Sequence, residues 1–164
     1  MPMTCNSGLK IEGSLIQKGK EKNLEIIQYS QECVAPRDMV SGLQTGKRAH
    51  KPICFRTQAD RSFPAWEQVL FTNDIIKTMK FNFWTTGEID KSFAGNAGKE
   101  VIAMTHELKN ATVCRVQTQM LNNKNKDLSH YEFFMDIEVT FEEITITWTN
   151  GGLMVKDGWN LQTS

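Results

Sequence analysis

Residues 131–148 show the most regular alternation of apolar and polar side chains in the chain. The first half is typical of a strand with one buried face, whose apolar positions are Tyr131, Phe133, Met135, Ile137, Val139 and Phe141. After Glu142 and Glu143 the apolar side chains move to even positions, which are Ile144, Ile146 and Trp148. A shift of one residue would turn the second half to the wrong face, so the pattern predicts a bulge or bend at Glu142 and Glu143.

Shorter alternating segments predict the other strands. They comprise residues 8–16, 24–34, 53–58, 75–86, 101–108, 111–118 and 153–159, the last following an Asn150–Gly151 pair typical of a type I′ hairpin turn. The apolar phase changes within residues 24–34, which indicates a second bulge. Lys109 and Asn110 are expected to break the chain between two strands, and residues 87–99 and 121–129 are predicted connections.

One short helix is predicted, over the sequence SFPAWEQVLF at residues 62–71. Pro64 suits the first helical turn, where its missing N–H is not needed. The apolar stripe that can pack on a sheet consists of Phe63, Trp66, Val69 and Leu70, and the helix is expected to end by residues 72–74. A helix this short needs tertiary packing to persist. With seven to nine strands, the pattern favours a mainly antiparallel barrel or sandwich.

Residues 35–51 form an unusually long connection between two predicted strands. The segment has no sustained period and contains Pro36, Gly42 and Gly46. Long loops without structure of their own are usually functional or disordered. Because Met39 and Leu43 are apolar, we expect an ordered loop that lies on another surface; the alternative is a flexible, solvated loop.

The composition of the chain is that of one ordinary globular domain over residues 1–164. Nineteen basic residues balance nineteen acidic ones, so no net charge attracts nucleic acid or an anionic membrane. The first residues lack the basic flank and apolar run of a signal peptide, and no stretch is long and apolar enough to span a membrane. The chain is therefore expected to be made and folded in the cytoplasm.

No catalytic, cofactor or metal site is predicted from the motifs. The four cysteines lie far apart without a CxxC pair, which favours reduced thiols over a disulfide framework or a zinc site. Residues 95–100, GNAGKE, lack the spacing and the final Ser or Thr of a phosphate-binding loop. Glu142 and Glu143 are adjacent on a strand and face opposite ways, and the histidines His50, His106 and His130 are scattered.

The sequence SGLQTGKRAHKP at residues 41–52 resembles a stretch of the Hcp family, the haemolysin-coregulated tube proteins of bacterial type VI secretion. Four further groups of motifs occur in the same order. They are LKIEG near the start, IIQYSQE in the second predicted strand, LKNATVCRVQTQM before the polar loop, and FFMDIEVTFEEITITW followed by DGW near the end. The resemblance covers nearly the whole chain.

The resemblance implies a compact antiparallel β-barrel of two sheets with one short flanking α-helix and a long extended loop. It also implies a non-catalytic subunit that assembles as hexameric rings, which stack into a tube inside a contractile sheath. Such a tube carries a spike protein and effector proteins out of the cell, and its lumen shelters effectors before export. The subunit would be cytoplasmic until type VI secretion exports it, and afterwards extracellular or in the target cell.

The extended loop of the family corresponds to residues 35–52 of this chain and implies a site of subunit contact. We assign to it Met39, Leu43, Gly46, Lys47, Arg48, His50 and Pro52. The six apolar side chains along residues 131–141 would contribute about 1.5–3 kcal/mol each if fully buried, whereas surface ion pairs contribute roughly 0–1 kcal/mol. We therefore expect sheet faces and the loop, rather than charges, to hold the assembly.

Two other functions remain open at this point. The first is a small β-barrel hydrolase or isomerase that acts as a monomer and uses His50 or His106 with a carboxylate. The second is an adhesin-like β-sandwich binding module, which would be expected to carry an export signal.

Overall fold

Antiparallel strands account for most of the computed structural model, which describes residues 3–6, 11–86, 100–122, 124–128 and 133–159. The strands are β1 (Met3–Asn6), β2 (Leu24–Ser30), β3 (Cys33–Val34), β4 (Ala49–His50), β5 (Ile53–Gln58), β6 (Ile76–Thr86), β7 (Glu100–Gln119), β8 (Phe134–Thr140), β9 (Glu143–Trp148) and β10 (Leu153–Gly158). One α-helix, α1 (Phe63–Thr72), and one short 3₁₀ turn, η2 (Asn150–Gly152), complete the described elements. The predicted strand class with one helix is confirmed.

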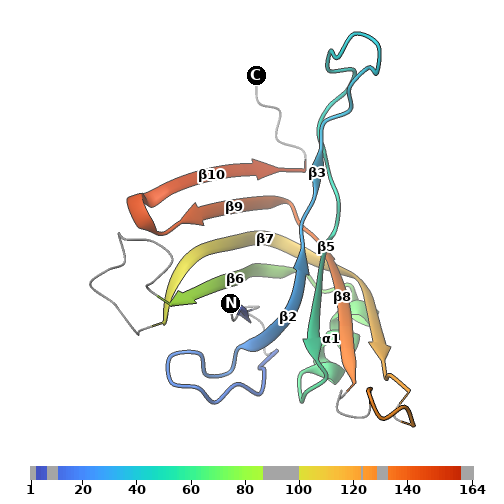
Figure 1. Ribbon diagram of the computed structural model, residues 1–164, viewed down its shortest axis with the longest axis vertical. Helices are drawn as coiled ribbons and strands as arrows, with labels where there is room; N and C mark the ends of the chain where they lie inside the picture. The colour runs from blue at the N-terminus through green and yellow to red at the C-terminus, as the bar shows by residue number, and fades with distance from the viewer. Residues whose placement is uncertain (1–2, 7–10, 87–99, 123, 129–132, 160–164) are drawn as a thin grey trace.

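The main sheet curls until its two ends meet. Its strand order is β10-β9-β7-β6-β1-β2-β5-β8, and β8 pairs with β7 as well as with β5, so six strands close on themselves. Two walls result, one formed by β6, β7, β9 and β10 and the other by β2, β5 and β8, which cross at a steep angle (Figure 1). This arrangement confirms the expected antiparallel barrel.

Strand β7 and the successive strands β8 and β9 form one long, bent pair. Residues 112–119 of β7 pair with β8, and residues 104–109 pair with β9. At the bend Asn110 has a φ of 50°, and its side chain donates to Glu142 Oε2 at 2.5 Å. The backbone N–H of Glu142 also donates to the carbonyl of Lys109 at 3.1 Å. The bend predicted at Glu142 and Glu143 is therefore confirmed.

The predicted break at Lys109 and Asn110 is wrong, because β7 runs through both residues as a single strand. Asn tolerates the left-handed conformation better than most residues, so the strand bends there without ending. The paired strands β8 and β9 bend at the same level, which keeps their hydrogen bonds to β7 intact on either side of Asn110.

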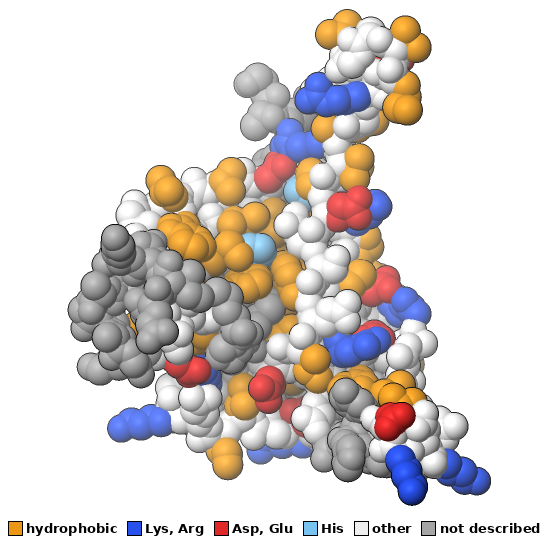
Figure 2. All heavy atoms as spheres, in the orientation of Figure 1, with side chains coloured by type: hydrophobic (Ala, Val, Ile, Leu, Met, Phe, Trp, Pro, Cys, Tyr) orange, Lys and Arg blue, Asp and Glu red, His pale blue; other side chains and the backbone are white. Residues whose placement is uncertain are grey.

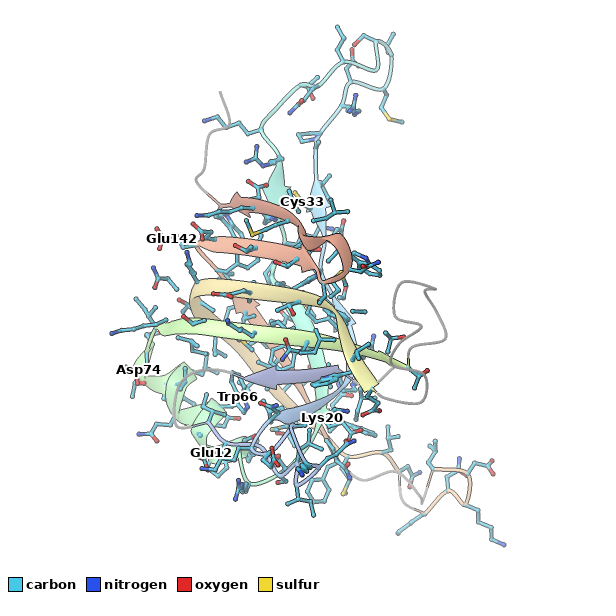
Figure 3. All side chains as sticks on the ribbon, turned by 90° about the vertical axis from the view of Figure 1, so that its left-hand side faces the viewer. Glu12, Lys20, Cys33, Trp66, Asp74 and Glu142 are labelled. Atoms are coloured by element: carbon cyan, nitrogen blue, oxygen red, sulfur yellow. The ribbon has the colours of Figure 1, made fainter. Side chains whose placement is uncertain are left out.

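The core lies between the two walls and under α1. Met135, Ile137 and Val139 of β8 are fully buried, as the alternation predicted. Trp66 of α1 is also fully buried, and its ring meets that of Phe55 with centroids 5.7 Å apart (Figure 3). The helix ends at Asn73, whose φ of 53° and backbone N–H bonded to the carbonyl of Val69 stop it where the sequence predicted.

Strand β5 has the predicted bounds, and the bulge predicted in residues 24–34 lies between Ile26 and Gln28. The extra residue there, Ile27, is 53% exposed, whereas Ile26 is buried. The change in the apolar alternation within residues 24–34 therefore corresponds to a β-bulge in the pairing of β2 with β5.

Other predicted details are wrong. Residues 11–16 form no strand. The chain makes a tight loop there, closed by a backbone bond from Gly13 N to Lys22 O at 2.8 Å, and a Cβ atom on Gly13 would come within 2.1 Å of the Asn23 carbonyl oxygen. Residues 8–10 and 87–99 lie outside the described part. The β9–β10 hairpin is confirmed. The Asn150–Gly151 pair does not form the predicted type I′ turn, because that turn needs a positive φ at both residues and Asn150 has none. Ile75 and Phe133 are exposed, and β1 was not predicted.

Replacing Ile137 by Ala should lower the free energy of unfolding by about 2–5 kcal/mol, because the side chain is fully buried in the closed sheet. The matched control is Ile27→Ala at the exposed bulge, for which we expect a loss below about 1 kcal/mol. Urea unfolding of both variants measures the difference. Equal losses would contradict the placement of β8 at the centre of the core.

Candidate functional site

Residues 33–50 form a long hairpin, called the arm below, that projects from one end of the barrel (Figure 1). β3 and β4 pair at its base, and an antiparallel bridge joins Arg37 to Gln44 further out. Backbone bonds from Thr45 N to Pro36 O at 3.1 Å and from Asp38 N to Leu43 O at 2.9 Å tie the two sides together. The long connection predicted here is therefore a hairpin with backbone bonds of its own, and whether its tip lies on another surface stays a prediction.

The outer turn of the arm is built around Asp38. Its carboxylate accepts bonds from the backbone N–H of Val40 at 3.0 Å and from the Ser41 hydroxyl at 2.7 Å. The Ser41 hydroxyl, followed by the backbone donors, lowers the pKa of Asp38 below its ordinary value. Gly42 closes the turn with a φ of 69°, a conformation that favours glycine. The turn thus has a local sequence cause in the spacing of Asp38 and Gly42.

Apolar side chains gather at the outer end of the arm. Met39 is 100% exposed, Val40 is 95% exposed and Leu43 is 70% exposed. Figure 2 shows hydrophobic side chains at this outer end of the projection, beyond Lys and Arg side chains that lie nearer the body of the molecule. Within the described part of the chain these side chains are exposed and belong to no core, so they are available to another molecule.

The base of the arm is fixed to β10 by a charged pair. The guanidinium of Arg48 donates to both oxygens of Asp157, and His50 Nε2 lies 3.0 Å from Asp157 Oδ2. The backbone N–H of Gly158 donates to Asp157 Oδ1 at 2.8 Å. Arg48 above all, with smaller contributions from Gly158 and His50, lowers the pKa of Asp157 from 3.8 to about 2. A bidentate contact between arginine and a carboxylate fixes the orientation of the two side chains as well as the distance between them.

Aromatic rings hold the His50 side chain, which is buried. The imidazole meets Phe141 with ring centroids 5.3 Å apart and Trp159 at 6.2 Å, and those two rings are 5.5 Å from each other. Phe141 lies at the bend between β8 and β9, so the arm, the bend and the end of β10 meet at one place.

The residues predicted for subunit contact separate into three groups along the arm. Met39 and Leu43 lie at the tip, Gly46 and Lys47 lie exposed on the shaft, and Arg48, His50 and Pro52 lie at or next to the base, where they are half-buried or buried. Their role in subunit contact stays a prediction. The sequence analysis did not assign Val40, Asp157 or Trp159 to the site. Asp157 and Trp159 belong to the DGW motif at residues 157–159, which could have indicated them.

The geometry gives no support to the monomeric hydrolase or isomerase. His106 is buried and bonds to the Tyr29 hydroxyl at 2.8 Å rather than to a carboxylate, and burial lowers its pKa to about 4. His50 does meet a carboxylate, but Asp157 is also held by Arg48.

One group of side chains with metal-binding atoms lies at the base of the arm. Cys33, His50 and Asp157 each offer one ligand atom, and these atoms lie within 4.8 Å of one another. The sequence argued against a zinc site because the four cysteines lie far apart without a CxxC pair, a pattern that says nothing of His50 and Asp157. Among the helices that the structure describes, none is long and apolar enough to cross a membrane.

Comparison with known families matches residues 3–148 to the family described as "Type VI secretion system effector, Hcp". The chain belongs to the Hcp family of type VI secretion proteins. The resemblance found in the sequence is thereby confirmed. The Hcp family assignment places this chain among secreted proteins and gives no support to the hydrolase alternative.

Similar proteins agree with the assignment. The "Major exported protein" of Pseudomonas aeruginosa PAO1 is 24% identical over 147 residues, covering 90% of this chain and 81% of that protein. The solved structure of the Hcp1 protein from E. coli EAEC 042 is 24% identical, has a TM-score of 0.79, and aligns over 97% of this chain and 99% of its own. The secreted protein Hcp3 from Pseudomonas aeruginosa is 18% identical with a TM-score of 0.71, and aligns over 97% and 99%. At these identities the structures establish the fold.

The charged pair at the arm base should make stability depend on pH below about 4. Since the pKa of Asp157 is lower in the folded chain than its ordinary 3.8, its contribution is present above that value and is lost as pH falls toward about 2. Wild type should therefore exceed Asp157→Asn in unfolding free energy by about 1–2 kcal/mol at neutral pH, and the two should converge near pH 2.

Chemical unfolding at a series of pH values measures this difference. Asp127→Asn, at an exposed position in the polar loop, is the matched control and should differ little from wild type at any pH. A difference for Asp157→Asn that stays constant from neutral pH down to pH 2 would contradict the role of the carboxylate charge.

Proposed function

We propose that this chain, as a single domain over residues 1–164, is a non-catalytic structural subunit of a type VI secretion tube. Six copies close into a ring, and rings stack into the tube that sheath contraction exports. Membership of the Hcp family supports this function, and the observation that carries it is the arm: an exposed apolar tip held on a base fixed to the barrel.

The arm has the properties expected of a contact element between copies. Its base is fixed by Arg48 and Asp157, so little freedom is lost when the tip binds. The tip side chains Met39 and Val40 are almost fully exposed, and their burial against a neighbour would be favourable by about 1–3 kcal/mol each. Rigid presentation and apolar burial together favour association.

A closed ring needs two different surfaces that meet head to tail. The second apolar surface that supports such a contact lies on β10, at the end of the sheet, where Leu153, Met154 and Val155 are 60–70% exposed. An edge strand with exposed apolar side chains is prone to pairing with another chain. The arm tip and the β10 edge are therefore the two surfaces we assign to contacts between copies.

The apolar face predicted to hold the assembly has a different role. Met135, Ile137, Val139 and Phe141 lie inside the chain's own barrel, so they are not available to another copy. The expectation that apolar burial outweighs surface charge is kept, but it now rests on the arm tip and β10.

Partners and location follow from the proposed tube. The subunit stays in the cytoplasm until export, and its partners are further copies, the sheath, the spike protein and effector proteins sheltered in the lumen. Equal numbers of acidic and basic residues favour neither nucleic acid nor membrane as a partner.

Replacing Met39 by Ser should weaken ring formation while leaving the fold intact, because the side chain is fully exposed in the single chain. We expect the association constant to fall by at least about tenfold, as the loss of one buried apolar side chain requires. Native mass spectrometry over a concentration series measures the fall, and circular dichroism checks the fold.

The matched control is Ile16→Ser, which removes an apolar side chain that is 93% exposed but lies outside the arm. Its ring formation should equal that of the wild type. Normal ring formation by the Met39 variant would contradict a role of the arm tip in subunit contact. A wild-type chain that forms no ring would contradict the proposed tube.

A further inference from the structure

Three side chains that bind divalent metals converge at the base of the arm. Cys33 comes from β3, His50 from β4 and Asp157 from β10. His50 Nε2 is 3.0 Å from Asp157 Oδ2 and 4.0 Å from Cys33 Sγ. Figure 3 labels Cys33 at this position, close to the end of the barrel from which the arm projects. The three ligand atoms therefore come together only in the folded chain.

The distances between these atoms suit a tetrahedral metal. Zinc bonds of about 2.0 Å to nitrogen and oxygen and about 2.3 Å to sulfur place the N and O ligands about 3.3 Å apart, and the S and N ligands about 3.5 Å apart. The separations of His50 Nε2 from Asp157 Oδ2 and from Cys33 Sγ differ from these values by about half an ångström or less, and Cys33 Sγ lies within 4.8 Å of the Asp157 carboxylate oxygen, so the thiol has the largest gap to close. Because Cys33 is exposed, a small rotation of its side chain can close the gap.

The chemistry of the ligands limits which metal they suit. One thiolate, one imidazole and one carboxylate match Zn²⁺ and its close analogue Co²⁺, whereas Mg²⁺ and Ca²⁺ prefer sites made of oxygen atoms. The geometry points to a site for a divalent metal of the zinc type, formed by Cys33, His50 and Asp157.

The surroundings of the ligands support the site. Arg48 and the Gly158 N–H orient the Asp157 carboxylate, and a metal would take the Oδ2 lone pair that now faces His50 Nε2. Phe141 and Trp159 hold the His50 ring in place. The exposed Cys33 thiol gives a metal a path in from solvent.

Binding would join the two strands of the arm base to β10. Three protein ligands leave one tetrahedral position for water or for a donor atom of another molecule. All three ligands belong to one chain, so metal binding does not require ring formation. This inference and the proposed tube can therefore fail separately.

Titration of the reduced, full-length chain with Co²⁺ under anaerobic conditions tests the site. We expect one tightly bound cobalt per chain and the near-ultraviolet charge-transfer band of a thiolate bound to cobalt. Cys33→Ser should abolish that band and weaken cobalt affinity by at least about tenfold, since even the loss of an outer-shell partner costs that much. The variant should fold normally, because Cys33 is exposed.

Cys114→Ser is the matched control, because Cys114 is also an exposed free thiol but lies on β7. It should keep the band at full strength. With Zn²⁺ at about a hundred times the wild-type dissociation constant, the Tm of wild type and of the control should rise by about 5–10 °C, whereas that of Cys33→Ser should rise by no more than about half as much. A thiolate band that persists in Cys33→Ser, or a wild-type chain that gives no band in excess cobalt, would overturn the site.

Discussion

The double pairing of β8 is the constraint on which the rest of the structure depends. β8 hydrogen-bonds to β5 along one edge and to β7 along the other, and its inward side chains are completely buried. This closes six strands into a barrel and leaves few open edges. The bend at Asn110 and Glu142 then redirects β7 and β9 together, so that β10 comes to lie beside the base of the arm.

The arm divides its chemistry along its length. Charged and aromatic contacts at Arg48, His50 and Asp157 fix its base to the barrel, while the tip is apolar and makes no contribution to the core. A polar base and an apolar tip suit a contact element, because the base sets direction and the tip supplies the favourable burial. The same base brings together Cys33, His50 and Asp157, so a metal there would strengthen the part of the arm that must be rigid.

Features with a local pattern could be predicted from the sequence. The bounds of β5, the end of α1 and the bulge at Ile27 each follow from periodicity or turn chemistry within a few residues. Features that depend on distant pairing could not. Asn110 was predicted as a break because its partner Glu142 is 32 residues away, and the pairing of Arg48 with Asp157 was not predicted because the two are 109 residues apart. The grouping of Cys33, His50 and Asp157 could not be predicted either, because the three residues are distant in the sequence and share no motif.

The central claim, that this member of the Hcp family is a ring-forming structural subunit, is tested most directly by native mass spectrometry of the purified, reduced chain. Imaging of the same sample should look for rings with a central hole. The account predicts a species of six times 18.7 kDa that encloses a visible lumen. A strict monomer across a wide range of concentrations would contradict it.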